Sequence, residues 1–140
     1  MKKLNFLTAI LASIFALQFT WAQPGQYEVV AGAFYFSPNS FTIEAGSTVT
    51  FINVGGLHDV NFIASSIGNN DNFGNPEEFY LTPVYSTGPS SPVEIGTIEF
   101  NEVGIYSYDC AIGNHAANGM IGTIIVEPQG VYPGCMDQNA

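Results

Sequence analysis

The sequence predicts an all-β chain that folds as a Greek-key β-sandwich of seven or eight strands. The 140 residues include 15 Gly and 8 Pro, which suit a chain with many turns, and few stretches have a helical period. Hydrophobic residues make up 46% of the chain and include 11 Phe and 7 Tyr, enough for one core. Several segments alternate between apolar and polar residues, which is the period of a half-buried strand.

The first strands are predicted where β-branched and aromatic residues recur and turn residues separate them. These segments are residues 27–36, 41–44, 48–53 and 60–63. Ser37-Pro38-Asn39-Ser40 and Ala45-Gly46-Ser47 are the turns between the first three. Gly55 and Gly56 interrupt the pattern just before His58. We therefore expect His58 beside a break in the sheet.

Residues 64–92 are the least patterned part of the chain. Asn75 is a good N-cap residue, Pro76 suits the first helical position, and two acidic residues follow, so one short helix through residue 81 is predicted. Alternation returns in three further strands, at residues 93–100, 106–110 and 121–126. Because strand side chains alternate, Tyr108 and Cys110 are expected to point inward and Asp109 outward.

The two ends of the chain are predicted to lie outside the folded domain. Residues 1–22 have a basic start, an apolar run and a small-x-small cleavage site, which is typical of a secretory signal peptide. The domain is expected over residues 23–128, and residues 129–140 are interpreted as a linker or tail. The Gly134-Cys135 end resembles the opening of a repeat found in large secreted bacterial proteins, so the chain is either the front of a longer polypeptide or ends in a tail with a spare thiol.

Charge restricts the partners of the exported chain. Lys2 and Lys3 are the only Lys or Arg residues, so removal of residues 1–22 changes the formal charge from −10 to −12. Nucleic acid and anionic membranes are poor partners for such a surface, and no membrane insertion is expected. A basic redox protein would be attracted to it. The acidity is equally well interpreted as serving only solubility.

Four residues form a candidate metal site. Cys110, His115 and Met120 follow the spacing Cys-x4-His-x4-Met, and His58 is the only other histidine in the chain. Two imidazoles, a thiolate and a thioether suit copper better than zinc or calcium, because copper accepts soft sulfur ligands. Each residue also has an ordinary interpretation: Met120 as core, a histidine as solvated, and Cys110 in a disulfide with Cys135. Those interpretations leave the shared pattern unexplained.

Several segments resemble the cupredoxins, small blue-copper proteins of the plastocyanin type. The resemblance covers residues 34–126 and is strongest in Gly104-Ile105-Tyr106-Ser107-Tyr108-Asp109-Cys110 and in Gly119-Met120-Ile121-Gly122. It implies a cupredoxin-like sandwich, one type 1 copper ion that alternates between Cu(I) and Cu(II), and His58, Cys110, His115 and Met120 as ligands. It also implies that Tyr106 is a corner tyrosine. His115 would be the partly exposed ligand, with Leu57, Ala116 and Ala117 around it.

Three departures from the family pattern affect these expectations. The four residues between Cys110 and His115 are closer to the spacing of phytocyanins than of plastocyanins. Asp59 stands where Asn is frequent, and since a carboxylate cannot donate, a weaker tie between the ligand loops is expected. Asp109 stands where plastocyanins have a surface tyrosine, so that electron route is not carried over.

These observations predict a periplasmic or secreted monomer that shuttles single electrons between redox proteins. The partners expected are basic cytochromes or a terminal oxidase or reductase. The alternatives are a carrier that sequesters copper ions, and a module of a larger secreted protein in which copper only stabilises the fold. An enzyme is not expected, because no histidines remain for a type 2 or type 3 copper centre.

Overall fold

The computed structural model describes residues 24–130, which form two β-sheets packed face to face. Apart from one 3-10 turn, η1, the regular structure of this range consists of nine strands. The elements are β1 (Gln26–Gly32), β2 (Tyr35–Ser37), β3 (Ser40–Glu44), β4 (Ser47–Asn53), β5 (Gly56–Asn61), β6 (Tyr80–Ser86), β7 (Val93–Phe100), β8 (Gly104–Asp109), η1 (Ala116–Asn118) and β9 (Ile121–Glu127). The predicted all-β sandwich is confirmed, with nine strands in this range where seven or eight were expected.

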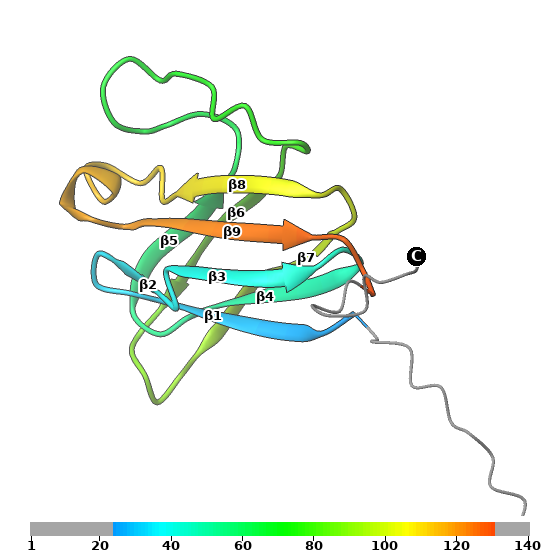
Figure 1. The fold of residues 1–140 in the computed structure, drawn as a ribbon. Helices are drawn as coiled ribbons and strands as arrows, with labels where there is room; N and C mark the ends of the chain where they lie inside the picture. Colours follow the sequence, from blue (N-terminus) through cyan, green and yellow to red (C-terminus); the bar gives the residue numbers. More distant parts are fainter. Residues whose placement is uncertain (1–23, 131–140) are drawn as a thin grey trace, which may run out of the picture.

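The sheets have the orders β2-β1-β4-β7 and β3-β9-β8-β5-β6. Two neighbouring pairs are parallel, β1 with β4 and β3 with β9, and the other pairs are antiparallel. Figure 1 shows that the loop after β8 and the turn between β1 and β2 lie at one end of the sandwich, while β9 runs toward the other end. Loops from both sheets therefore meet at a single end.

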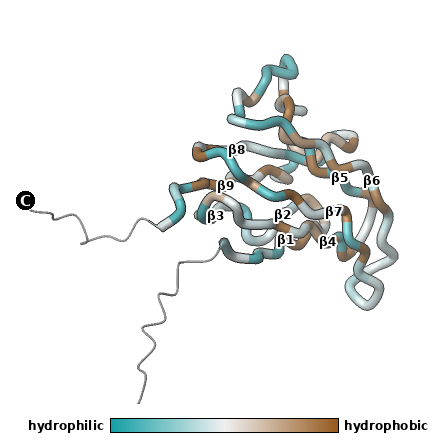
Figure 2. The backbone as a smooth tube through the Cα atoms, turned by 90° about the vertical axis from the view of Figure 1, so that its right-hand side faces the viewer, coloured by the Kyte–Doolittle hydropathy of each residue, from teal (hydrophilic) through white to brown (hydrophobic). Residues whose placement is uncertain are grey.

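Strict alternation places one face of each central strand in the core. In β4 every second residue is fully buried, and β9 buries Gly122, Ile124 and Val126. The hydropathy along the chain in Figure 2 follows this pattern, with hydrophobic residues spaced along the strands and hydrophilic residues in the loop that projects beyond β8. The period-two segments of the sequence thus correspond to real strands.

Aromatic rings fill the middle of the core. Phe62 is fully buried and stacks on Tyr108 with ring centroids 4.7 Å apart. Its ring also meets those of Phe51 and Phe100 edge-on, at 6.1 and 5.6 Å. Since buried aromatic pairs add about 0.5–1.5 kcal/mol beyond the area they bury, this cluster is a rigid support for the strands beside it.

Tyr106 occupies the corner position that the resemblance implies. Its hydroxyl donates to the carbonyl oxygen of Glu102 at 2.9 Å and to the carboxylate of Glu77 at 3.2 Å. Burial raises the pKa of the Tyr106 phenol, with the charge of Glu77 as a further cause.

The short helix predicted from Asn75 through residue 81 is wrong. Residues 76 and 77 form a bend, and β6 begins at Tyr80. The Asn75 side chain does not cap a helix because it binds neighbouring backbone. Its amide nitrogen donates to the carbonyl oxygens of Phe62 and Ser107 at 2.7 and 2.8 Å, and its oxygen accepts the N–H of Ser107 at 2.8 Å.

The segment expected as one strand over residues 27–36 is two strands. β1 and β2 are joined by a turn in which Phe34 has a φ of 62°, and they pair antiparallel through Gly32 and Tyr35. The signal peptide predicted over residues 1–22 and the tail predicted beyond residue 130, with Cys135, lie outside the described residues. Among residues 24–130, no helix is long and apolar enough to cross a membrane.

Candidate metal centre

His58, Cys110 and His115 come together at the end of the sandwich where the loops meet. One potential ligand atom from each of the three lies within 4.8 Å of the others. His58 belongs to β5, Cys110 follows β8, and His115 precedes η1. Residues separated by some fifty positions in the chain thus form one cluster, and they are three of the four candidate ligands named from the sequence.

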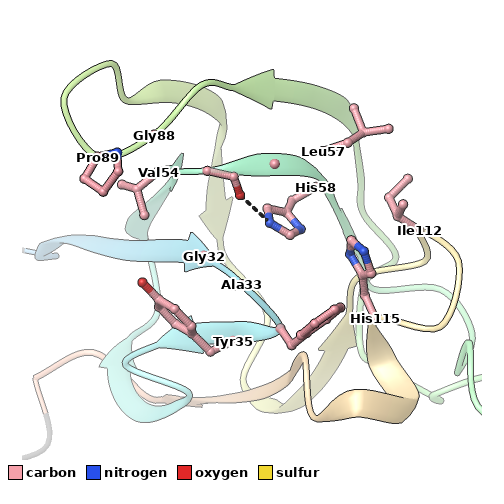
Figure 3. Close-up of a pocket in the computed structure, with 13 residues that line it drawn as sticks. Gly32, Ala33, Tyr35, Val54, Leu57, His58, Gly88, Pro89, Ile112 and His115 are labelled. Carbon is pink, nitrogen blue, oxygen red and sulfur yellow. Dashed lines mark hydrogen bonds between the residues drawn. The ribbon is translucent and has the colours of Figure 1, made fainter.

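Both imidazoles present the same nitrogen to the cysteine sulfur. The Sγ atom of Cys110 lies 3.8 Å from Nδ1 of His58 and 3.5 Å from Nδ1 of His115. Nε2 of His58 lies 2.8 Å from the carbonyl oxygen of Gly55, the dashed contact in Figure 3. Because a carbonyl only accepts, Nε2 carries the proton and Nδ1 keeps its lone pair for a metal.

The environment of His58 also favours a neutral ring. The side chain is 2% exposed. Burial lowers the pKa of His58 below its ordinary value, and the nearby His115 lowers it further. These effects outweigh the bond to Gly55 and the charge of Asp59, which raise the pKa. A neutral imidazole is the form that binds a metal ion.

A compact loop places the remaining residues. The N–H of Cys110 donates to the carbonyl oxygen of Met120 at 3.1 Å. The N–H of Met120 donates to the carbonyl oxygen of His115, also at 3.1 Å. Gly119 has a φ of 106°, a conformation that residues with a Cβ rarely adopt, so the turn into Met120 suits glycine. Met120 is fully buried beside Cys110 in the same core cluster. The loop therefore holds Cys110, His115 and Met120 close together along the backbone.

Cys110 is a buried thiol and is not in a disulfide within the described range. Burial raises the pKa of Cys110 to about 11, although backbone hydrogen bonds from Asp59 and Ile112 act in the opposite direction. A bound cation would reverse this effect, since a coordinating thiol loses its proton. Two free imidazole nitrogens, a buried thiol and a buried thioether are a donor set that fits copper.

Two carboxylates that the sequence analysis treated as departures lie within this end of the fold. Asp59 is 1% exposed and its Oδ1 accepts the N–H of Ala111 at 2.7 Å, so the tie between the ligand segments is present. Asp109 was expected to point outward and to be exposed to solvent. This expectation is wrong, because Asp109 is fully buried. Asn61 and Ser66 cover Asp109 and donate to its carboxylate.

An open depression of about 590 Å³ lies beside His58 and His115. Figure 3 shows both rings in this depression, with Leu57 and Ile112 on one side and Tyr35 on the other. Leu57 lines the depression as expected, but Ala116 and Ala117 do not, and Ala116 is buried beneath the surface.

Phe34 is a lining residue that the sequence analysis missed. It is 45% exposed, and its ring meets His115 edge-on with centroids 5.1 Å apart. The sequence placed Phe34 inside a strand, where half of the side chains are buried. The preceding Gly32-Ala33 pair is the signal that could have indicated a turn with an exposed tip.

The comparisons with known proteins agree with this geometry. The family described as copper binding proteins, plastocyanin/azurin family, matches residues 23–127. A plastocyanin from Scenedesmus fuscus is 34% identical over 99 residues, which is 69% of this chain and 91% of that protein. Auracyanin B superposes with a TM-score of 0.51 at 21% identity, over 76% of this chain and 91% of its own. A mutant of amicyanin in its Cu(I) form gives a TM-score of 0.51 at 21% identity, over 73% and 82%.

The fold and the cluster define a copper-binding β-sandwich protein. The chain belongs to the plastocyanin/azurin family of copper-binding proteins, the cupredoxins. Copper is therefore its cofactor, and the members of this family are copper electron carriers.

Proposed function

We propose that this protein is an exported one-electron carrier in which His58, Cys110, His115 and Met120 hold a single type 1 copper ion. The leader is assigned to residues 1–22, the copper domain to residues 23–128 and the tail to residues 129–140. The domain acts as a monomer, without a catalytic role of its own.

The observation that best supports this function is the convergence of two Nδ1 atoms on the Cys110 sulfur. Bound copper supplies a one-electron couple, which is efficient only if the ligands move little between the two oxidation states. The residues of this chain meet that condition. His58 is anchored to Gly55, and Cys110 and Met120 are joined by a backbone hydrogen bond beneath the surface.

Electrons enter and leave through His115. His115 is more exposed than His58, and it lies beside the apolar depression. A small apolar surface suits brief docking, in which weak interfaces permit rapid turnover. The acidic surface raises the rate of encounter with a basic redox partner, such as a cytochrome or the docking domain of a terminal oxidase or reductase.

Burial of the two sulfur ligands favours electron transfer over the transfer of copper ions. Cys110 and Met120 are both fully buried, so a copper-accepting protein cannot reach the ligand sulfurs unless the site opens. A protein that hands over copper needs ligands that exchange at the surface.

Voltammetry of the copper-loaded protein tests this function. We expect a reversible one-electron couple in the wild type and none in the Cys110→Ser variant. Stopped-flow oxidation by a basic cytochrome at low and high salt then tests the docking surface, and we expect a slower rate at high salt. Absence of a reversible couple in copper-loaded wild-type protein would overturn the proposal.

A further inference from the structure

The strands that lead to His58 and Cys110 are joined in an unusual way. β5 and β8 are neighbours in their sheet, but Asn61 with Asp109 is the one ladder pair between these two strands. Side chains make the other connections. Asp59 of β5 accepts from the residue that follows Cys110, and Asn61 of β5 donates to Asp109, the residue that precedes Cys110. One carboxylate, Asp109, thus precedes Cys110 in the chain, and the other, Asp59, is hydrogen-bonded to the residue that follows it.

The carboxylate of Asp109 is held only by neutral donors. Oδ1 accepts from Nδ2 of Asn61 at 2.8 Å and from Oγ of Ser66 at 3.0 Å. Oδ2 accepts from the backbone N–H of Ser66 at 2.6 Å. Three donors converge on two oxygens of a fully buried side chain, which is the arrangement that an ionised carboxylate requires.

Asp59 also accepts hydrogen bonds only from neutral donors. Its Oδ1 accepts the N–H of Ala111 at 2.7 Å, and its Oδ2 accepts the hydroxyl of Tyr80 at 2.9 Å. The side chain is 1% exposed and is adjacent in the chain to His58. Neither carboxylate has a cationic partner, because the sequence has no Lys or Arg after residue 3. Both negative charges are therefore screened by dipoles alone.

We propose that Asp59 and Asp109 are positioning residues that also set the redox balance of the copper site, by favouring Cu(II) over Cu(I) through two buried negative charges. This inference rests on the proposed function only in that copper occupies the site.

The direction follows from Coulomb's law. A negative charge stabilises a divalent ion more than a monovalent one, and the attraction decays slowly where burial excludes water and salt. The carboxylates would therefore lower the reduction potential. The hydrogen bonds from Ala111 to Asp59 and from Asn61 to Asp109 keep the charges and the ligand strands at fixed separations, so the effect does not depend on mobile side chains.

Two kinds of variant separate charge from structure. Asp59→Asn and Asp109→Asn remove one charge each. Asp59→Asn is the cleaner of the two, because an amide oxygen can still accept from Ala111 and the amide nitrogen can donate to Tyr80. Tyr80→Phe and Ser66→Ala keep both charges. Tyr80→Phe removes a donor to Asp59, and Ser66→Ala removes a donor to Asp109. Glu99→Gln, an exposed acid on β7 in the other sheet, is the control for net charge.

The measurement is the affinity of each variant for Cu(I) and for Cu(II), by competition with chelators, together with the midpoint potential. We expect Asp59→Asn to raise the Cu(I) to Cu(II) ratio at fixed potential about threefold to tenfold, where tenfold corresponds to about 59 mV for a one-electron couple. The change should lie in the Cu(II) affinity. Tyr80→Phe and Ser66→Ala should leave the ratio unchanged or lower it, and Glu99→Gln should leave it unchanged.

Two results would overturn the inference. One is an unchanged ratio in both Asp→Asn variants, measured on protein with the wild-type far-UV spectrum. The other is a shift of the same sign and size in Tyr80→Phe, which would indicate a purely structural role. The affinity ratio can be measured even if the wild type exchanges no electrons with a partner protein, so failure of the carrier function is distinguishable.

Discussion

The ring of Phe34 meets the ring of His115 edge-on, with 5.1 Å between centroids and an interplanar angle of 83°. Phe34 is carried by the turn between β1 and β2, whereas His115 lies in the loop before β9. The exposed aromatic ring and the imidazole thus come from two loops, each joining strands of a different sheet, and they meet at the surface where partners are proposed to dock.

Replacement of Phe34 by Ala should slow electron exchange with little effect on stability. Because Phe34 is 45% exposed, we expect the free energy of unfolding to change by less than about 1 kcal/mol. Exchange with a redox partner should slow by up to about tenfold, the factor that a docking contact of about 1.4 kcal/mol supplies. Stopped-flow rates and urea unfolding measure the two effects. The control is Ile105→Ala, which removes an exposed side chain from the opposite end of β8 and should not change the rate.

Tyr108 and Tyr106 should respond oppositely to loss of the hydroxyl group. The hydroxyl of Tyr108 is buried and has no hydrogen-bond partner within residues 24–130. Tyr108→Phe is therefore expected to be neutral or to stabilise the fold by about 1 kcal/mol, since an unsatisfied buried group is costly. Tyr106→Phe loses the bonds to Glu102 and Glu77 and should destabilise by about 0.5–1.5 kcal/mol. Chemical denaturation of both variants gives the comparison, and a loss of stability in Tyr108→Phe would contradict the structure.

Asn75 should be more important for stability than its place in an irregular segment indicates. Its side chain makes three hydrogen bonds to the backbone of Phe62 and Ser107. We expect Asn75→Ala to cost about 2–3 kcal/mol, because part-buried backbone groups lose their partners. Asn69→Ala in the exposed part of the same segment is the matched control and should change stability by less than about 0.5 kcal/mol. Equal effects of the two substitutions would argue against a structural role of the Asn75 hydrogen bonds.

The stability of the metal-free protein should decline on both sides of neutral pH. The pKa of His58 is lowered from 6.5, so its contribution is present above about pH 6.5 and is lost as the pH falls toward the lower folded value. The pKa of Cys110 is raised from 9.0 to about 11, so its contribution is present below pH 9 and is lost as the pH rises to about 11. Above pH 10 the raised pKa values of Tyr106 and Tyr108 act in the same direction as Cys110.

Urea unfolding of the apoprotein across this range measures both limbs. Cys110→Ser should flatten the curve between about pH 9 and 10, where the tyrosines contribute little. His58→Gln should flatten it below pH 6.5. An alkaline limb that is unchanged in Cys110→Ser would show that the thiol is not the group responsible.

Local patterns predicted the strands well because burial in a sandwich imposes a period of two. The alternation in residues 48–53 corresponds to β4, and that in residues 121–126 corresponds to β9. The candidate ligands could be predicted from residue type, since His58 and His115 are the only histidines in the chain. That Nδ1 faces the sulfur in both rings could not be predicted, because it depends on the carbonyl of Gly55 and on the path of the loop.

The failures arise where tertiary contacts override local preference. Asn75 has the sequence context of a helix cap, but its side-chain amide is instead bonded to the backbone N–H and carbonyl oxygen of Ser107. Asp109 occupies an outward position by alternation, and its burial depends on Ser66, more than forty residues away. Such contacts leave no periodic signal in the sequence.

Titration of the apoprotein with Cu(II), followed by visible absorption, tests the proposed ligand set most directly. If His58, Cys110, His115 and Met120 bind one copper ion, an intense blue absorption should grow to saturation at a single copper per chain. The colour should be absent in Cys110→Ser and weakened or altered in His115→Gln. A colourless complex with wild-type protein, or a blue complex with Cys110→Ser, would contradict the assignment.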